Sequence, residues 1–109
     1  MTYSLQFKKS ALKEWKKLGH VVREQFKKKI AERLEPPRVP ASALSGAENL
    51  YKIKLRQLGY RLVYSVNDKT VTVTVIAIGK RNRNEIYTVA LSRTRDRQLR
   101  KTHSYFRRG

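Results

Sequence analysis

The middle of the chain contains three runs in which apolar and polar side chains alternate, as they do along strands with one buried face. We predict strands at Leu50–Arg56, Tyr60–Val66 and Thr70–Ile78, with turns at Leu58-Gly59 and Asn67-Asp68. Strands joined by turns this short must pair antiparallel. This segment therefore predicts a small antiparallel β-sheet.

A helical hairpin is predicted before this sheet. After a short strand at Thr2–Phe7, apolar residues recur at helical spacing over Ser10–Leu18, and a glycine ends this helix. A second helix spans about His20–Leu34 and stops before two prolines. Ser10 is a plausible N-cap for the first helix. The following residues, 36–49, read as a loop that Leu44 anchors to the core.

The chain is expected to end in a short helix and a basic tail. A short apolar face predicts a helix from Asn84 to about Arg93, and the residues after it have too few apolar side chains to build a core. The predicted order is β-α-α-β-β-β plus a short C-terminal helix, an α+β fold. We expect a domain at residues 1–93 and a tail at 94–109. The hairpin should cover one face of the sheet and leave the other face free for function.

The net charge indicates the class of partner. The chain has 109 residues with 26 Lys and Arg against 8 Asp and Glu, a formal net charge of +18. This balance attracts polyanions, of which nucleic acid is the first candidate, a membrane surface the second and an acidic protein the third. The chain has no cysteine, and no apolar run approaches the roughly 20 residues that span a bilayer. We expect a cytoplasmic protein.

Cations gather on the face of the sheet that the helices should leave open. Side chains alternate across a strand, so Lys52, Lys54 and Arg56 share the face opposite Tyr51, Ile53 and Leu55. Pairing of the next strand brings Arg61 near Lys54. The last strand is followed by further cations, and a tyrosine lies one helical turn beyond them: Lys80, Arg81, Arg83 and Tyr87.

Such a set has the chemistry to cleave RNA without a metal, a histidine or another cofactor. The 2′-hydroxyl can attack the adjacent phosphate when a base takes its proton, and arginines stabilise the charge that develops on the phosphate oxygens. A lysine among other cations has a lowered pKa and can act as the base. However, alternating Lys and Arg most often form a solvated face. On the residue pattern alone, RNA binding without cleavage is favoured over catalysis.

Four segments carry a resemblance to a known family: ALKEWKKLG, VREQFKKK, LYKIKLRQLGYRLVY and GKRNRNEIY. They resemble the RelE branch of the RelE/ParE toxin superfamily, and the resemblance covers residues 1–93. It implies a microbial-ribonuclease-like fold and a toxin that enters the ribosomal A site and cuts mRNA. The implied products are a 2′,3′-cyclic phosphate and a 5′-hydroxyl.

The resemblance also implies a role for each matching residue. Lys52 and Lys54 match strand lysines of the family, with Lys54 as the preferred general base. Arg61 matches an arginine that stabilises the transition state, and Arg81 one that binds phosphate and protonates the leaving group. Tyr87 matches a tyrosine that stacks on and orients the mRNA. We expect three further cations to contact RNA: Arg56, Lys80 and Arg83.

The same resemblance implies the ribosome and a RelB-type antitoxin as partners, with operator DNA bound through the antitoxin. The antitoxin is expected to block the active face. Two alternatives stay open: a ParE-like toxin that inhibits DNA gyrase without catalysis, and a non-catalytic RNA-binding module. The basic tail exceeds the typical length of the family.

Overall fold

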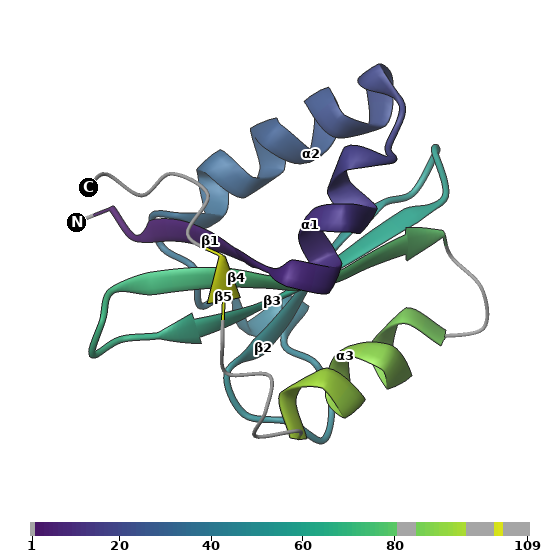
Figure 1. The fold of residues 1–109 in the computed structure, drawn as a ribbon. Coiled ribbons are helices and arrows are strands. Elements are labelled where there is room, and N and C mark those ends of the chain that lie inside the picture. Colours follow the sequence, from purple (N-terminus) through teal and green to yellow (C-terminus); the bar gives the residue numbers. More distant parts are fainter. Residues whose placement is uncertain (1, 81–84, 96–101, 104–109) are drawn as a thin grey trace.

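A five-stranded sheet with strand order β2-β3-β4-β1-β5 forms the centre of the molecule (Figure 1). The computed structural model describes residues 2–80, 85–95 and 102–103. The elements are, in chain order, β1 (Ser4–Lys8), α1 (Lys9–Lys16), α2 (His20–Arg33), the 3-10 helix η1 (Pro40–Ser42), β2 (Leu50–Leu55), β3 (Tyr60–Asn67), β4 (Thr72–Lys80), α3 (Glu85–Arg95) and β5 (Thr102–His103).

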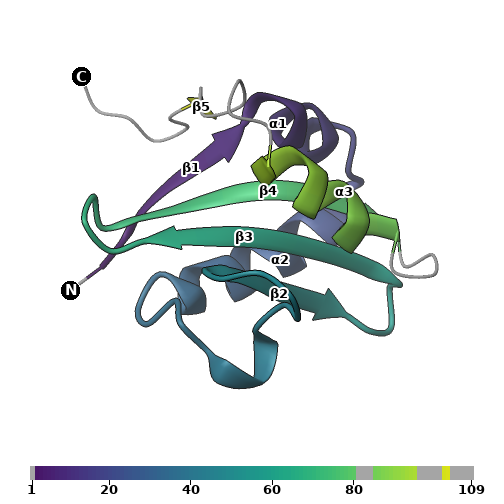
Figure 2. The ribbon, with the colours of Figure 1, turned by 90° about the horizontal axis from the view of Figure 1, so that it is seen from below.

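The helices α1 and α2 cover one face of the sheet and bury the larger of two cores (Figure 2). Trp15 of α1 packs on Phe7 of β1 with ring centroids 5.2 Å apart, and Phe26 of α2 is fully buried. These aromatic side chains lie in the core, as their helical spacing predicts. The α+β class and the helical hairpin are thus confirmed. The first helix begins at Lys9, so Ser10 lies inside it rather than at its cap.

The first strand makes the sheet mixed rather than purely antiparallel. β2, β3 and β4 pair antiparallel as expected, but β1 pairs parallel with β4, with Leu5 opposite Val73. Two helices and a long loop separate β1 from β2, so no tight turn dictates the direction of β1. β4 therefore lies between β3 and β1, in the middle of the sheet as predicted.

The second face of the sheet is only partly free, because α3 packs on it. Val63 and Ala77 from the strands and Ile86 and Ala90 from α3 form a second buried cluster. A β-bulge in β4 contributes to this contact: Val63 pairs with Ala77 and Tyr64 with Val75, so Ile76 is an extra residue. Ile76 and Ala77 consequently both join the second cluster. The prediction that this face is uncovered is wrong for the part under α3.

The loop before β2 is anchored as predicted. Leu44 and Leu50 are buried in the second cluster, and the backbone N–H of Leu44 donates to the carbonyl of Leu50 at 2.9 Å. Within residues 2–80, 85–95 and 102–103, no helix has the length and apolar character needed to cross a membrane.

The short strand β5 pairs with the free edge of β1. His103 lies opposite Phe7 and Thr102 opposite Lys8, in the antiparallel direction. The α3 helix reaches Arg95, two residues beyond the predicted domain end. The rest of the predicted tail, residues 96–101 and 104–109, lies outside the described residues. The division into a domain and a separate tail stays a prediction.

Candidate active site

Two neighbouring strands bring three of the predicted cations together. Lys52 and Lys54 project from β2 on the same face, and Arg61 of β3 is the direct cross-strand partner of Lys54. All three side chains are half-buried. The strand alternation and the register of the hairpin therefore place these residues as expected.

Tyr87 of α3, the helix that packs on this face of the sheet, completes the cluster. Arg61 donates a hydrogen bond from Nη1 to the Tyr87 hydroxyl at 2.9 Å. The ring centroid of Tyr87 lies 5.9 Å from the Arg61 guanidinium carbon and 5.7 Å from Lys52 Nζ. Both distances are within the range of cation–π attraction. We call Lys52, Lys54, Arg61 and Tyr87 the active-face cluster.

The position of Tyr87 depends on close packing between α3 and β4. A Cβ added to Gly79 would lie 3.1 Å from Cδ1 of Ile86, the residue before Tyr87. A larger residue at position 79 would therefore push against the start of α3. Ile86 and Ala90 are buried on the same side of α3, which leaves Tyr87 directed along the sheet surface toward Arg61.

The surroundings of Lys54 favour its neutral form. Partial burial lowers the pKa of the Lys54 ammonium group below its usual value, and the positive charges of Arg61, Lys52 and Arg56 lower this pKa further. Both effects disfavour the protonated state. A lysine with a lowered pKa is better suited than an ordinary lysine to accept a proton near neutral pH.

The remaining predicted contacts are distributed differently. Arg56 is exposed in the turn after β2, and its positive charge acts on Lys54. Lys80 pairs with Tyr60 across the strands, and Tyr60 packs against the core under α1 and α2. Directly opposed residues share a face of the sheet, so Lys80 lies on the side away from Arg61. Arg81 and Arg83 lie outside the described residues.

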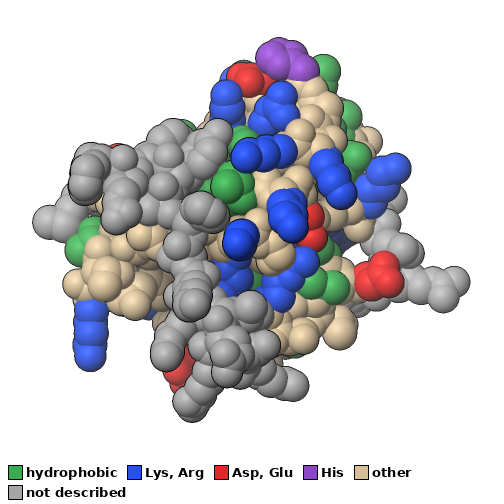
Figure 3. Space-filling view, viewed as in Figure 1, with side chains coloured by type: hydrophobic (Ala, Val, Ile, Leu, Met, Phe, Trp, Pro, Cys, Tyr) green, Lys and Arg blue, Asp and Glu red, His purple; other side chains and the backbone are tan. Residues whose placement is uncertain are grey.

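The cations are not confined to this cluster. Figure 3 shows Lys and Arg side chains spread over α1 and α2 on the opposite side of the sheet. Within the part of the chain that the structure describes, no three His, Asp or Glu residues are grouped so that they could hold a metal ion. The active-face cluster thus consists of cations and one tyrosine hydroxyl.

Comparison with known proteins places the chain in a family. Residues 5–85 match the family described as "ParE toxin of type II toxin-antitoxin system, parDE". Over 93 residues the chain is 57% identical to the mRNA interferase toxin RelE of Escherichia coli K12, a match that covers 85% of this chain and 98% of the relative. The chain belongs to the RelE branch of the RelE/ParE toxin superfamily.

Solved structures of RelE share this fold. A mutant of the E. coli toxin RelE in the free state superposes with a TM-score of 0.79 at 55% identity, covering 85% of this chain and 98% of that one. The toxin in the intact E. coli RelBE toxin-antitoxin complex superposes with a TM-score of 0.72 at 58% identity, covering 74% of this chain and 99% of the other. The microbial-ribonuclease-like RelE fold predicted for this chain is confirmed.

This RelE-family chain also has a polar contact that the sequence analysis missed. Glu14 of α1 accepts hydrogen bonds from Arg93 of α3 through both carboxylate oxygens, at 3.1 and 2.9 Å. Oε1 of Glu14 also accepts from the backbone N–H of Ile78 at 3.0 Å, and Arg93 donates to the carbonyl of Ile76 at 2.8 Å. Glu14 is the one acid in helix α1, whose other charged residues are lysines, and this is the feature of the sequence that could have indicated the contact.

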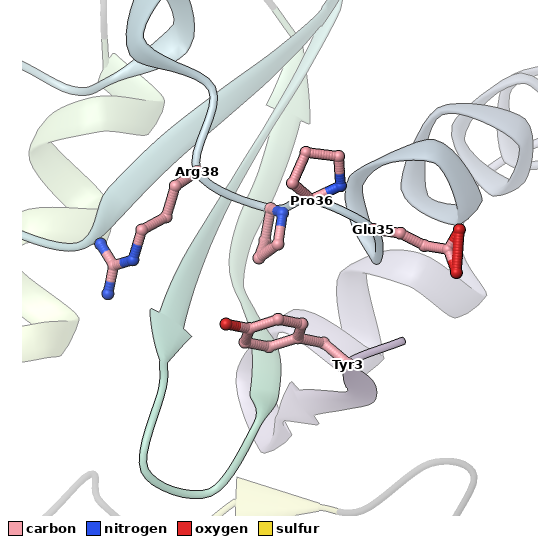
Figure 4. A pocket seen from close by; sticks show the side chains of 5 residues that line it. Tyr3, Glu35, Pro36 and Arg38 are labelled. Atoms are coloured by element: carbon pink, nitrogen blue, oxygen red, sulfur yellow. The ribbon is translucent and has the colours of Figure 1, made fainter. Parts of the chain in front are cut away.

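A hollow of this RelE-family fold lies away from the active-face cluster, and the cation that lines it is already paired with an acid. Tyr3, Glu35, Pro36 and Arg38 line it (Figure 4). The Arg38 guanidinium forms an ion pair with Asp68 at 2.9 Å, and the Tyr3 hydroxyl donates to the same carboxylate at 2.7 Å. This network ties the N-terminal strand to the β3–β4 turn, so we assign it a structural role.

Proposed function

We propose that this protein is the toxin of a type II toxin–antitoxin system and an endoribonuclease that cleaves mRNA in the ribosomal A site. The observation that carries the proposal is the convergence of Lys52, Lys54, Arg61 and Tyr87 on one open part of the sheet. The 57% identity to a protein named mRNA interferase toxin RelE supports the same function.

The proposed reaction is an internal transesterification. Lys54 in its neutral form takes the proton of a 2′-hydroxyl, and the 2′-oxygen forms a bond to the adjacent phosphorus. The bond between phosphorus and the 5′-oxygen of the next nucleotide breaks, and that oxygen receives a proton. The products are a 2′,3′-cyclic phosphate and a 5′-hydroxyl. No external water or metal ion takes part in this step.

The other residues of the site stabilise the transition state and orient the RNA. Arg61 lies next to Lys54 and stabilises the charge that develops on the phosphate oxygens, with Lys52 adding positive charge. Tyr87, held by Arg61, stacks on the RNA and fixes its orientation. By family resemblance Arg81 protonates the leaving oxygen, while Arg83, Arg56 and Lys80 contact RNA.

The ribosome is the proposed positioning partner. A site without a dedicated histidine or carboxylate gains most of its rate from correct alignment of the reacting hydroxyl and phosphate, which a ribosome-bound mRNA supplies. A RelB-type antitoxin neutralises the toxin by covering the active face. The complex binds operator DNA through the antitoxin and represses its own operon. With these partners, the proposed site of action is the cytoplasm.

Mapping of mRNA 5′ ends in a translation extract, with and without ribosomes, tests this function. We expect cuts within A-site codons that require ribosomes, and Arg81→Ala and Tyr87→Ala variants that fold but do not cut. Intact mRNA together with DNA breaks in expressing cells would instead favour a ParE-like gyrase inhibitor. RNA binding without cuts on ribosomes would favour a non-catalytic RNA-binding module.

A further inference from the structure

A groove of about 410 Å³ lies between helix α2 and the end of β2 with the turn that joins it to β3, and Lys54 is one of its lining residues. Its volume lies within the roughly 300–1,000 Å³ range of small-molecule sites. Val21, Gln25 and Lys29, one turn apart on α2, form one wall. Residues 54–58 form the other wall.

The charged groups that line this groove all have the same sign. They are Lys29, Lys54 and Arg56, and no acidic residue lines the groove. Helix α2 carries two acids near Lys29, namely Glu32 and Glu24, and neither lines the groove. Glu24 forms an ion pair with Lys27 at 3.2 Å. A concave surface with cations alone attracts an anion such as a phosphate group.

The groove also contains two exposed apolar side chains. Val21 is 61% exposed and Leu58 is 41% exposed, and these are the exposed large hydrophobic residues of the described part of the chain. They stand on opposite walls of the groove. Gln25 lies between Val21 and Lys29 on the same side of α2 and can both donate and accept hydrogen bonds.

This combination matches a nucleotide better than an acidic peptide. A nucleotide joins one phosphate to a flat base that has apolar faces and polar edges, and single-stranded RNA is recognised by stacking and by hydrogen bonds to those edges. Cations, apolar walls and an amide occur here in one groove. Lys54 belongs both to the lining of this groove and to the active-face cluster, whose proposed partner is RNA.

We infer that this groove is a subsite for one nucleotide of RNA next to the cleaved phosphate. Lys29 and Arg56 bind its phosphate, Val21 and Leu58 contact its base, and Gln25 binds a polar edge of the base. This inference rests on the proposed nuclease function and adds a site that selects or holds the RNA. The nucleotide comes from the mRNA or from ribosomal RNA, which share this chemistry.

A charge reversal on α2 tests the subsite against a matched control. Lys29→Glu changes a groove residue, while Lys28→Glu makes the same charge change on an adjacent exposed residue outside the groove. We expect Lys29→Glu to lower kcat/KM on programmed ribosomes about tenfold more than Lys28→Glu, with a salt slope smaller by about one phosphate contact. In a Val21→Ala/Leu58→Ala double variant, kcat/KM should fall roughly fivefold, which is the lower end of the effects measured for base stacking.

Cleavage assays on ribosomes whose mRNAs carry each of the four bases at the positions flanking the cut identify the source of the nucleotide. If the loss of kcat/KM in the groove variants depends on the base at one flanking position, and Gln25→Ala weakens this dependence, the nucleotide belongs to the mRNA. If kcat/KM falls equally for all mRNAs because KM for ribosomes rises, the nucleotide belongs to ribosomal RNA. Thermal unfolding of each variant should match the wild-type protein, because the substituted side chains are exposed.

Three results would overturn the inference. If the wild-type protein cuts but Lys29→Glu behaves like Lys28→Glu, the groove is not an RNA subsite, although the nuclease function stands. If the groove variants change only neutralisation by the antitoxin, the groove binds protein. If the wild-type protein does not cut mRNA on ribosomes, the proposed function fails and the subsite fails with it.

Discussion

Arg93 at the end of α3 and Glu14 in α1 form a two-pronged ion pair, although 79 positions separate them in the chain. The pair is mostly shielded, since the Arg93 and Glu14 side chains are 19% and 31% exposed. It connects the helix that carries Tyr87 to the helices on the other face of the sheet. The position of Tyr87, which we propose orients the RNA, therefore depends on a contact outside the active-face cluster.

Removal of Arg93 should weaken both the fold and the active site. In an Arg93→Met variant, Glu14 loses its charged partner, and we expect a loss of about 1–3 kcal/mol in the free energy of unfolding. Cleavage should fall as α3 loosens. Urea unfolding and the cleavage rate on ribosomes measure the two effects. Lys27→Met is the control, because the Lys27–Glu24 pair is exposed and contributes at most about 1 kcal/mol. Equal losses in the two variants would contradict the role assigned to Arg93.

Substitutions of Tyr87 should separate its hydroxyl from its ring. Tyr87→Phe removes the group that accepts the Arg61 hydrogen bond but keeps the ring above the cations. We expect a reduction in the single-turnover cleavage rate of about tenfold, the equivalent of one hydrogen bond to a charged group. Tyr87→Ala should abolish detectable cleavage, because stacking on the base is lost together with the hydrogen bond. Identical rates for the two variants would show that the ring does not contribute.

The pH dependence of cleavage should follow the ionisation of Lys54. The base must be neutral, so the rate should rise with pH until Lys54 is deprotonated, below the pH expected for an ordinary lysine. Arg56→Ala removes one of the charges that lower this pKa, so the rising limb should move to higher pH. The measurement is the single-turnover rate against pH at saturating ribosome concentration. Lys28→Ala, a cation removed from outside the cluster, should leave the limb in place.

Tyr64 should contribute to stability rather than to activity. This residue is only 1% exposed; its hydroxyl donates to the carbonyl of Pro37 at 2.7 Å and accepts from Arg33 at 2.9 Å. Tyr64→Phe removes both hydrogen bonds, although Arg33 still donates to the carbonyl of Lys52 and to the hydroxyl of Ser42. We expect a loss of about 1–3 kcal/mol in the free energy of unfolding, measured by chemical denaturation. Tyr51→Phe should lose less, because the half-buried Tyr51 hydroxyl accepts one long bond of 3.2 Å from Arg38. A large drop in kcat for Tyr64→Phe at unchanged folding would contradict this assignment.

Much of the active-face cluster follows from the local pattern of residues. Alternation along β2 assigns Lys52 and Lys54 to one face, because successive side chains of a strand point to opposite sides. The short turn at Leu58-Gly59 then sets the register that pairs Lys54 with Arg61. Both inferences depend on residues within about ten positions of one another, so they need no knowledge of the rest of the fold.

Lys80 shows where the local pattern was insufficient. It is the last residue of β4, directly after Gly79, the cross-strand partner of Arg61, yet its pairing with Tyr60 directs it to the other face. The β-bulge at Ile76 is a second example, because an extra residue shifts the alternation of β4 and exposes two consecutive apolar side chains to α3. An apolar run does not show where such a residue is inserted, since all its members are buried.

The sequence by itself determined the three α-helices, the first four strands and the cationic face, because helix and strand periodicities are properties of neighbouring residues. The tertiary structure decided that β1 runs parallel to β4, that α3 covers part of the second face, and that Glu14 holds Arg93. It also decided that the groove beside Lys54 joins α2 to the β2–β3 turn. These contacts join segments far apart in the chain, and they depend on how complete surfaces fit together rather than on any local pattern.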